Sequence, residues 1–149
     1  MLDEKSETMV DDDITVKIKL FTPLTVEHFN KKNIELRNPI LSNLQTLCAR
    51  LNLIGAQWGQ EMVVTSGLRS QGQQEEMIKA GKTKASKSKH LDGCAADIYD
   101  PNGILKMWLR ENPKALEDAQ LWCEHGDYTP TWCHFQIVPP RSGNRWFIP

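Results

Sequence analysis

Two short segments hold the residues best suited to bind a metal ion, because each contains a histidine in or next to a run of residues that is typical of a strand. Residues 88–97 contain His90 and Asp97, and residues 131–136 contain His134. A catalytic zinc ion takes three protein ligands from His, Asp, Glu or Cys side chains and keeps one position for water. The two segments together offer such a set, but a structural histidine or an ordinary His–Asp hydrogen bond fits the same spacing.

The alternation of polar and apolar residues in these segments predicts how the side chains face. Successive side chains of a strand point to opposite faces. Residues 132–138 place His134 opposite an apolar face, and residues 94–99 do the same for Asp97. Since the apolar faces suit a core, both polar side chains are expected to point toward a cleft. Gly93 and the two alanines that follow Cys94 would let the backbone pack closely there.

Three motifs, in this order along the chain, resemble those of the M15 peptidases, which include D-alanyl-D-alanine carboxypeptidases and phage L-alanyl-D-glutamate endolysins. Residues 88–97 read SKHLDGCAAD and are similar to the signature SxHxxGxAxD. Residues 66–70, SGLRS, resemble SGxRS, and residues 132–134, WCH, resemble WxH. The span from the first to the last motif covers about half of the chain.

The resemblance implies a fold and a set of roles. It implies an α+β domain over residues 14–149, with a small antiparallel sheet flanked by helices, of the hedgehog or DD-peptidase type. His90, Asp97 and His134 match the family's zinc ligands, so the implied cofactor is Zn²⁺. Arg69 matches the arginine that binds a substrate carboxylate or stabilises the oxyanion, two tasks that suit a guanidinium group.

Further residues are expected near a substrate. Ser88 is expected to brace the His90 loop through its hydroxyl and to lie at the substrate. Trp132 shares a strand face with His134, and it either forms an apolar wall of the cleft or packs in the core. The lysine-rich residues 81–89 are either a solvated loop or a guide for an anionic substrate.

The general acid–base residue departs from the commoner family pattern. Many members place a carboxylate three residues before the last ligand, where this chain has Thr131. The nearest carboxylates are those of Glu124 and Asp127, of which Glu124 is favoured, and His125 is a third candidate. A carboxylate would take a proton from the zinc-bound water and return it to the leaving amine. All three residues also fit a polar loop between a helix and a strand.

These observations predict a zinc metallopeptidase that hydrolyses an amide bond in peptidoglycan stem peptides, either as a phage-type endolysin or as a D,D- or L,D-carboxypeptidase. The alternative is a catalytically inactive M15-like zinc-binding module that serves as a cell-wall-binding or virion structural component. The missing acid at Thr131 keeps that alternative open. A third hypothesis is a protein without zinc that has an incidental His/Asp pair.

Composition limits the remaining possibilities. The chain of 149 residues suits one domain, and its net charge of −1 predicts no nucleic-acid partner. No apolar run is long enough for stable membrane insertion, and no signal peptide is evident, so the protein is expected to be cytoplasmic as synthesised. It would then reach the cell wall through a pore or in a virion. The four cysteines form no CxxC pair and are expected to be free thiols.

Charge and periodicity also predict the order of the elements. Residues 1–13 carry a charge of −5 and are expected to form an acidic, poorly ordered tail. Asn38-Pro39 is a typical helix start and Gly55 the expected stop. The other expected elements are strands at residues 14–20, 62–65, 94–99 and 132–138, helices at 25–32, 71–80, 104–110 and 114–123, and an irregular tail at 141–149 held by Trp146 and Phe147.

Overall fold

A five-stranded sheet forms the centre of the computed structural model, which describes residues 5–10, 14–82 and 88–149. All neighbouring strands are antiparallel except the last pair, β5 and β7, which is parallel. The α+β class and the mainly antiparallel sheet predicted from the sequence are therefore confirmed. In spatial order the strands are β3 (Val64–Ser66), β4 (Ala95–Tyr99), β6 (Trp132–Gln136), β5 (Trp122–Glu124) and β7 (Trp146–Phe147).

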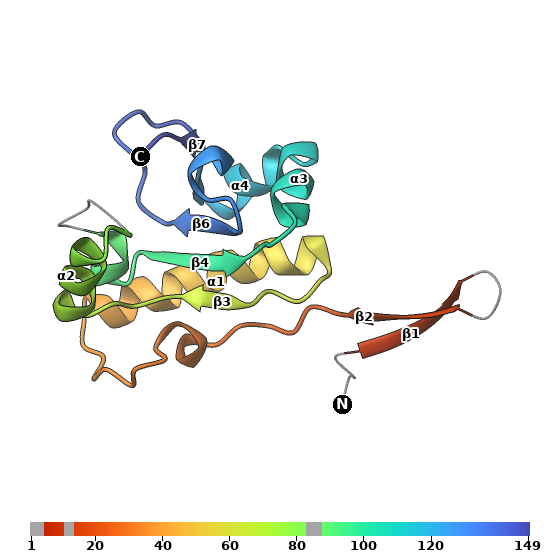
Figure 1. Ribbon diagram of the computed structural model, residues 1–149, viewed down its shortest axis with the longest axis horizontal. Coiled ribbons are helices and arrows are strands. Elements are labelled where there is room, and N and C mark those ends of the chain that lie inside the picture. Colours follow the sequence, from red (N-terminus) through yellow and green to blue (C-terminus); the bar gives the residue numbers. More distant parts are fainter. Residues whose placement is uncertain (1–4, 11–13, 83–87) are drawn as a thin grey trace.

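Helices surround this sheet, and the longest, α1, runs alongside its central strands (Figure 1). The expected helices at residues 71–80 and 104–110 are confirmed with ends shifted by one residue, and the segment after Thr25 forms a single 3-10 turn. No helix of the described residues is both long and apolar enough to cross a membrane. The helices are α1 (Ile40–Trp58), α2 (Gln71–Lys79), α3 (Ile104–Glu111) and α4 (Lys114–Ala119), with 3-10 turns η1 (Val26–Phe29), η2 (Lys89–Asp92) and η3 (Gly126–Tyr128).

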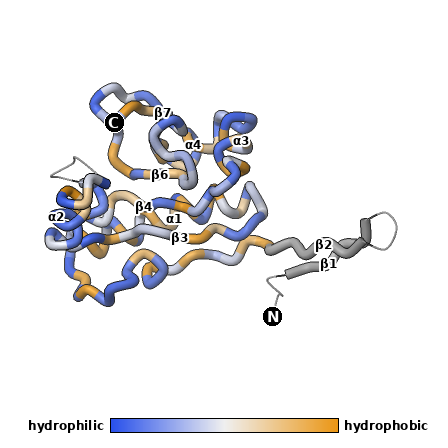
Figure 2. Tube along the Cα trace, in the orientation of Figure 1, coloured by the Kyte–Doolittle hydropathy of each residue, from blue (hydrophilic) through white to orange (hydrophobic). Residues whose placement is uncertain are grey.

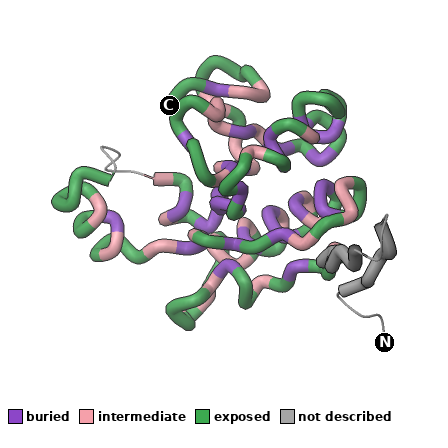
Figure 3. Tube along the Cα trace, turned by 45° about the vertical axis from the view of Figure 1, so that its right-hand side comes forward, coloured by how far each residue is buried: buried purple, intermediate pink, exposed green. Residues whose placement is uncertain are grey.

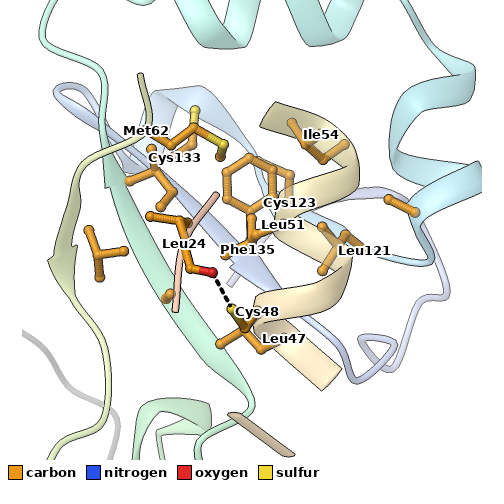
Figure 4. Packing of buried hydrophobic residues seen from close by; sticks show 14 of the residues in the cluster. Leu24, Leu47, Cys48, Leu51, Ile54, Met62, Leu121, Cys123, Cys133 and Phe135 are labelled. Carbon is orange, nitrogen blue, oxygen red and sulfur yellow. Dashed lines mark hydrogen bonds between the residues drawn. The ribbon is translucent and has the colours of Figure 1, made fainter. Parts of the chain in front are cut away.

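The core lies between α1 and the sheet. Apolar residues recur along α1 (Figure 2), and Leu47, Leu51 and Ile54 are fully buried. They pack around Phe135 and Leu121 (Figure 4), and buried residues gather where the helix meets the strands (Figure 3). Each such side chain stabilises the fold by about 1.5–3 kcal/mol through the burial of apolar surface. The core thus holds the strands that carry the functional residues.

Helix α1 continues past the expected stop at Gly55, so that prediction is wrong. The ring of Phe21 packs against Gly55 so closely that a Cβ there would lie 2.1 Å from the Phe21 Cε1 atom. The missing side chain therefore serves a close approach of two segments rather than a helix end. The helix ends at Gly59, whose φ of 80° is the left-handed conformation that glycine adopts easily.

The second difference concerns residues 114–123, which were expected to form one helix. Helix α4 ends at Ala119, the cap residue Gln120 adopts a left-handed φ of 55°, and Trp122 begins strand β5. Pairing decides this outcome, because Cys123 lies opposite Phe135 of β6 on one side and opposite Trp146 of β7 on the other. The tail at residues 141–149, which was expected to be irregular, therefore contains the short strand β7. Glu124, as the last residue of β5, lies within the sheet.

The N-terminal region differs from the expected acidic tail over part of its length. Strand β1 (Lys5–Val10) pairs antiparallel with β2 (Ile14–Lys19), and Val10 lies opposite Ile14. The pairing satisfies backbone N–H and C=O groups of both segments. The rest of the expected tail, residues 1–4 and 11–13, lies outside the described residues.

Candidate metal and substrate site

Three side chains converge at the centre of the sheet, and we call His90, Asp97 and His134 the ligand cluster. Asp97 of β4 lies directly opposite His134 of β6, and η2 brings His90 to the start of β4. The Asp97 Oδ1 atom lies 3.4 Å from His90 Nε2 and 3.0 Å from His134 Nδ1. One ligand atom from each side chain lies within 4.8 Å of the other two, a spacing at which one metal ion can be bound.

The backbone of Gly67 determines which nitrogen of His90 faces the cluster. The Gly67 carbonyl lies 2.8 Å from His90 Nδ1, and a carbonyl can only accept, so Nδ1 carries the proton and Nε2 is free toward Asp97. A Cβ on Gly67 would lie 2.4 Å from the Phe29 carbonyl oxygen, so only glycine lets this segment pack so closely against Phe29 of η1. Burial lowers the pKa of His90, which favours the neutral ring that a metal requires.

Gln136 determines which nitrogen of His134 faces the cluster. Its amide nitrogen donates to the Val138 carbonyl at 2.7 Å, so its amide oxygen must face His134 Nε2, 3.1 Å away. Nε2 is therefore the protonated nitrogen, and Nδ1 faces Asp97. Although burial lowers the pKa of His134, the hydrogen bond to Asp97 and its negative charge raise it overall. The sequence analysis placed Gln136 on the His134 face of its strand but assigned it no role.

Arg69 holds the other oxygen of Asp97. Its Nη2 atom lies 3.5 Å from Asp97 Oδ2, while Nε donates to Ser66 Oγ at 3.1 Å and Nη1 to Gln74 Oε1 at 3.3 Å. Burial opposes ionisation of Asp97, but the hydrogen bonds that His134 and His90 donate when their rings are protonated lower its pKa well below the usual range. Asp97 is thus a carboxylate that offers Oδ1 to the cluster and Oδ2 to Arg69.

A cleft of about 840 Å³ opens over the cluster, and it receives most of the residues expected at a substrate. Ser88 and Trp132 both line the cleft. Ser88 also accepts a hydrogen bond from the His90 backbone N–H at 3.2 Å, as its expected bracing role requires. Trp132 is half-buried, so it forms part of the wall rather than of the core.

The three candidates for general base, Glu124, Asp127 and His125, lie in different surroundings. Glu124 lines the cleft, and burial raises the pKa of its carboxyl. Asp127 and His125 are not among the residues that line the cleft, and the Asp127 side chain is 85% exposed and lies 3.5 Å from His125. Of the three candidates, the structure therefore brings only Glu124 to the cleft, by way of the strand that the sequence analysis missed. Thr131 also lines the cleft, but its hydroxyl cannot act as the base.

Comparisons with known proteins identify the family of the chain. A family model described as Peptidase M15 matches residues 22–120, about two thirds of the chain, and the chain therefore belongs to the M15 peptidase family. The crystal structure of the L-Ala D-Glu endopeptidase ChiX from Serratia marcescens is similar in fold, with a TM-score of 0.52 and 21% identity. That similarity covers 77% of this chain and 98% of the other. A search of curated proteins found no match.

Proposed function

We propose that this protein is a zinc-dependent peptidase that hydrolyses an amide bond in peptidoglycan stem peptides, as a phage-type endolysin or as a D,D- or L,D-carboxypeptidase. The observation that carries the proposal is the convergence of His90 Nε2, Asp97 Oδ1 and His134 Nδ1 beneath an open cleft. Membership of the peptidase family supports the type of reaction. The shared fold with an endopeptidase that is named for the L-Ala D-Glu bond supports the choice of substrate.

The donor set fits zinc. Two imidazole nitrogens and one carboxylate oxygen are ligands that catalytic zinc accepts while it keeps a position for water. Each histidine donates its other N–H to a protein oxygen, an arrangement that orients metal ligands and increases their basicity. When bound, zinc supplies a water with a pKa of about 7 and a Lewis acid for the amide carbonyl.

The residues around the cluster then have distinct tasks. Glu124 accepts a proton from the attacking water and returns it to the leaving amine, and its raised pKa makes its carboxylate a stronger base for the first transfer. The positive charge of Arg69 keeps Asp97 oriented and stabilises the oxyanion that develops in the same cleft. Ser88 and Trp132 contact the substrate on the walls of the cleft.

The direct test is mass spectrometry of purified peptidoglycan after incubation with the zinc-loaded protein, the metal-free protein and a Glu124→Gln variant. We expect new amino termini with the zinc-loaded parent and none in the other two digests. The residue at each new terminus identifies the bond and separates internal cleavage from trimming of an end. An unchanged digest with the zinc-loaded parent would contradict the enzymatic function.

Thr131 supports a second candidate, the catalytically inactive zinc-binding module that serves in cell-wall binding or in a virion. The hydroxyl at this position cannot act as the base, and it lines the cleft beside the cluster. For this candidate we expect one zinc ion per chain, co-sedimentation with peptidoglycan and an unchanged digest.

A further inference from the structure

The cleft continues past the ligand cluster along β4 and β6, and its far end is aromatic. Asp97 lies opposite His134. Two residues farther along β4, Tyr99 lies opposite Trp132. Residues two apart in a strand share a face, so both aromatic side chains lie on the cluster's side of the sheet. Tyr99, Trp132 and Tyr128 of η3 all line the cleft, and we call these three residues the aromatic platform.

The platform is uncharged and open to solvent. Tyr99 is 53% exposed, Tyr128 is 50% exposed, and Trp132 is half-buried. The lysines and the arginine that line the cleft belong to the segments around α2, at the opposite end of β4 (Figure 1). Large aromatic side chains that stay exposed in a cleft indicate a binding surface for an uncharged ligand.

Each side chain of the platform joins a flat ring to one polar group. Within the described residues, no hydrogen bond engages the tyrosine hydroxyls or the indole N–H of Trp132. Thr131, which also lines the cleft, adds a third hydroxyl beside Trp132. A saccharide ring matches this combination, because the C–H groups of one face pack on an aromatic ring while the hydroxyls at its edge form hydrogen bonds. An apolar side chain would use the rings and leave these polar groups without a role.

A buried lysine holds the platform in place. Lys106 of α3 donates to the Trp132 carbonyl, and its Nζ atom lies 3.8 Å from a carboxylate oxygen of Asp100, the residue that follows β4. A Cβ on Gly126 would lie 3.0 Å from the Lys106 Cδ atom, and Gly126 begins the turn that ends at Tyr128. One side chain thus contacts the segments that carry all three aromatic residues. A site fixed in this way loses little conformational freedom when a ligand binds.

We propose that the aromatic platform binds a saccharide ring of the glycan strand to which the stem peptide is attached. The inference rests on the proposed function, since it assumes that a stem peptide lies over the ligand cluster. Two residues of a strand span about 6.7 Å, which separates the aromatic pair from the cluster. The first amino acid of a stem peptide and the lactyl linker that joins it to the sugar extend about 7 Å together. The sugar therefore reaches the platform when the first peptide bond of the stem lies at the cluster.

The binding test uses the zinc-loaded full chain and two non-hydrolysable stem peptides in which a reduced CH₂–NH unit replaces the first amide. One probe carries an N-acetylmuramyl group at its amino end, and the other ends at the lactyl linker. Calorimetry should give about tenfold tighter binding of the muramyl probe, the effect of burying one face of a sugar ring against aromatic side chains. The gain should persist as the salt concentration rises, because the two probes carry the same charge.

The test variants are Tyr99→Ala/Tyr128→Ala and Tyr99→Leu/Tyr128→Leu, of which the second keeps apolar surface without a flat ring. The control is Ile104→Ala/Met107→Ala, which removes exposed apolar side chains of α3 that do not line the cleft. We expect both tyrosine variants to lose most of the gain and the control to keep it.

Equal binding of the two probes by the parent, or an undiminished gain in either tyrosine variant, would overturn the inference. If the parent shows the gain but cleaves neither normal peptide, the proposed function fails and the saccharide site stands. If the parent cleaves stem peptides but shows no gain, the proposed function stands and the saccharide site fails.

Discussion

The ligand cluster and Glu124 line the same cleft but are held in different ways. In the cluster, His90, Asp97 and His134 contact one another, and each also has a partner outside the cluster. Glu124 is the last residue of the three-residue strand β5, which pairs with the strand of His134. The comparison teaches that the proposed metal position depends on many contacts, whereas the proposed acid–base step depends on one side chain and the burial of its carboxyl.

The largest expected effect is on the cluster itself. His134→Ala should lower zinc affinity on the order of 1000-fold and abolish cleavage, because a lost ligand costs more than the 10–100-fold of an outer partner. Metal analysis and competition with a chelator measure the affinity, and far-ultraviolet circular dichroism checks the fold. His28→Ala, on the turn η1 outside the ligand cluster, is the control and should bind zinc as the parent does. Parent-like affinity in His134→Ala would remove this residue from the ligand set.

A change at Glu124 should lower catalysis and leave zinc affinity unchanged. Glu124→Gln should lower kcat by about 10²–10⁴-fold, the usual contribution of a general acid–base group, with zinc affinity unchanged. Steady-state kinetics on a stem-peptide substrate gives the first quantity and chelator competition the second. Asp127→Asn, a similar change on an exposed side chain, should leave both within a factor of two. A large loss in Asp127→Asn with little in Glu124→Gln would exchange the two roles.

Between these extremes lies the partner of His134. Gln136→Leu should lower zinc affinity by about 10–100-fold, because the Nε2–H of His134 loses its acceptor and the ring its fixed tautomer. Gln136→Glu should retain most of the affinity, since a carboxylate also accepts that proton. Chelator competition and the ¹⁵N shifts of the His134 ring provide the measurements. If Gln136→Leu binds zinc no more weakly than the exposed control Gln57→Leu, then Gln136 does not orient the ligand.

The pH dependence sharpens the comparison. Burial raises the pKa of Glu124, so the base form is lost at a higher pH than for an exposed glutamate as the pH falls. The acid limb of kcat/KM should therefore lie above the ordinary glutamate range near 4.3. A pH profile in zinc-saturated buffer measures the limb. Its disappearance in Glu124→Gln, but not in Asp127→Asn, is the expected assignment, and an identical limb in both variants would refute it.

The smallest expected effect concerns a cap beside the cluster. Ser88→Ala should cost about 1 kcal/mol of unfolding free energy, and zinc affinity should fall less than tenfold, since only the hydrogen bond to the His90 N–H is lost. Ser70→Ala removes the comparable cap of α2 and should cost similar stability without affecting zinc. Urea unfolding of the metal-free variants separates the two quantities. Equal zinc affinity in both variants would show that the η2 cap does not support the ligand.

The sequence by itself, through strand alternation and its resemblance to a family, predicted the three residues of the ligand cluster and the strands of Asp97 and His134. The spacing of the motif around His90 and Asp97, and the alternation around His134, are local patterns that a strand converts directly into side-chain direction. The α+β class followed from the resemblance to the family, and most helices followed from periodicity. These features depend on neighbours in the chain, so one sequence was enough to predict them.

Only the tertiary structure decided the features that depend on distant partners. Gly55 stays within α1 because Phe21 packs against it, and Glu124 reaches the cleft because β5 pairs with β6 and β7. The Gly67 carbonyl orients His90 from 23 residues away. A pocket of about 470 Å³ likewise lies between η1, the end of β3 and α2. Such contacts leave no periodic trace in the sequence, because their free energy arises between segments and only once the core has brought them together.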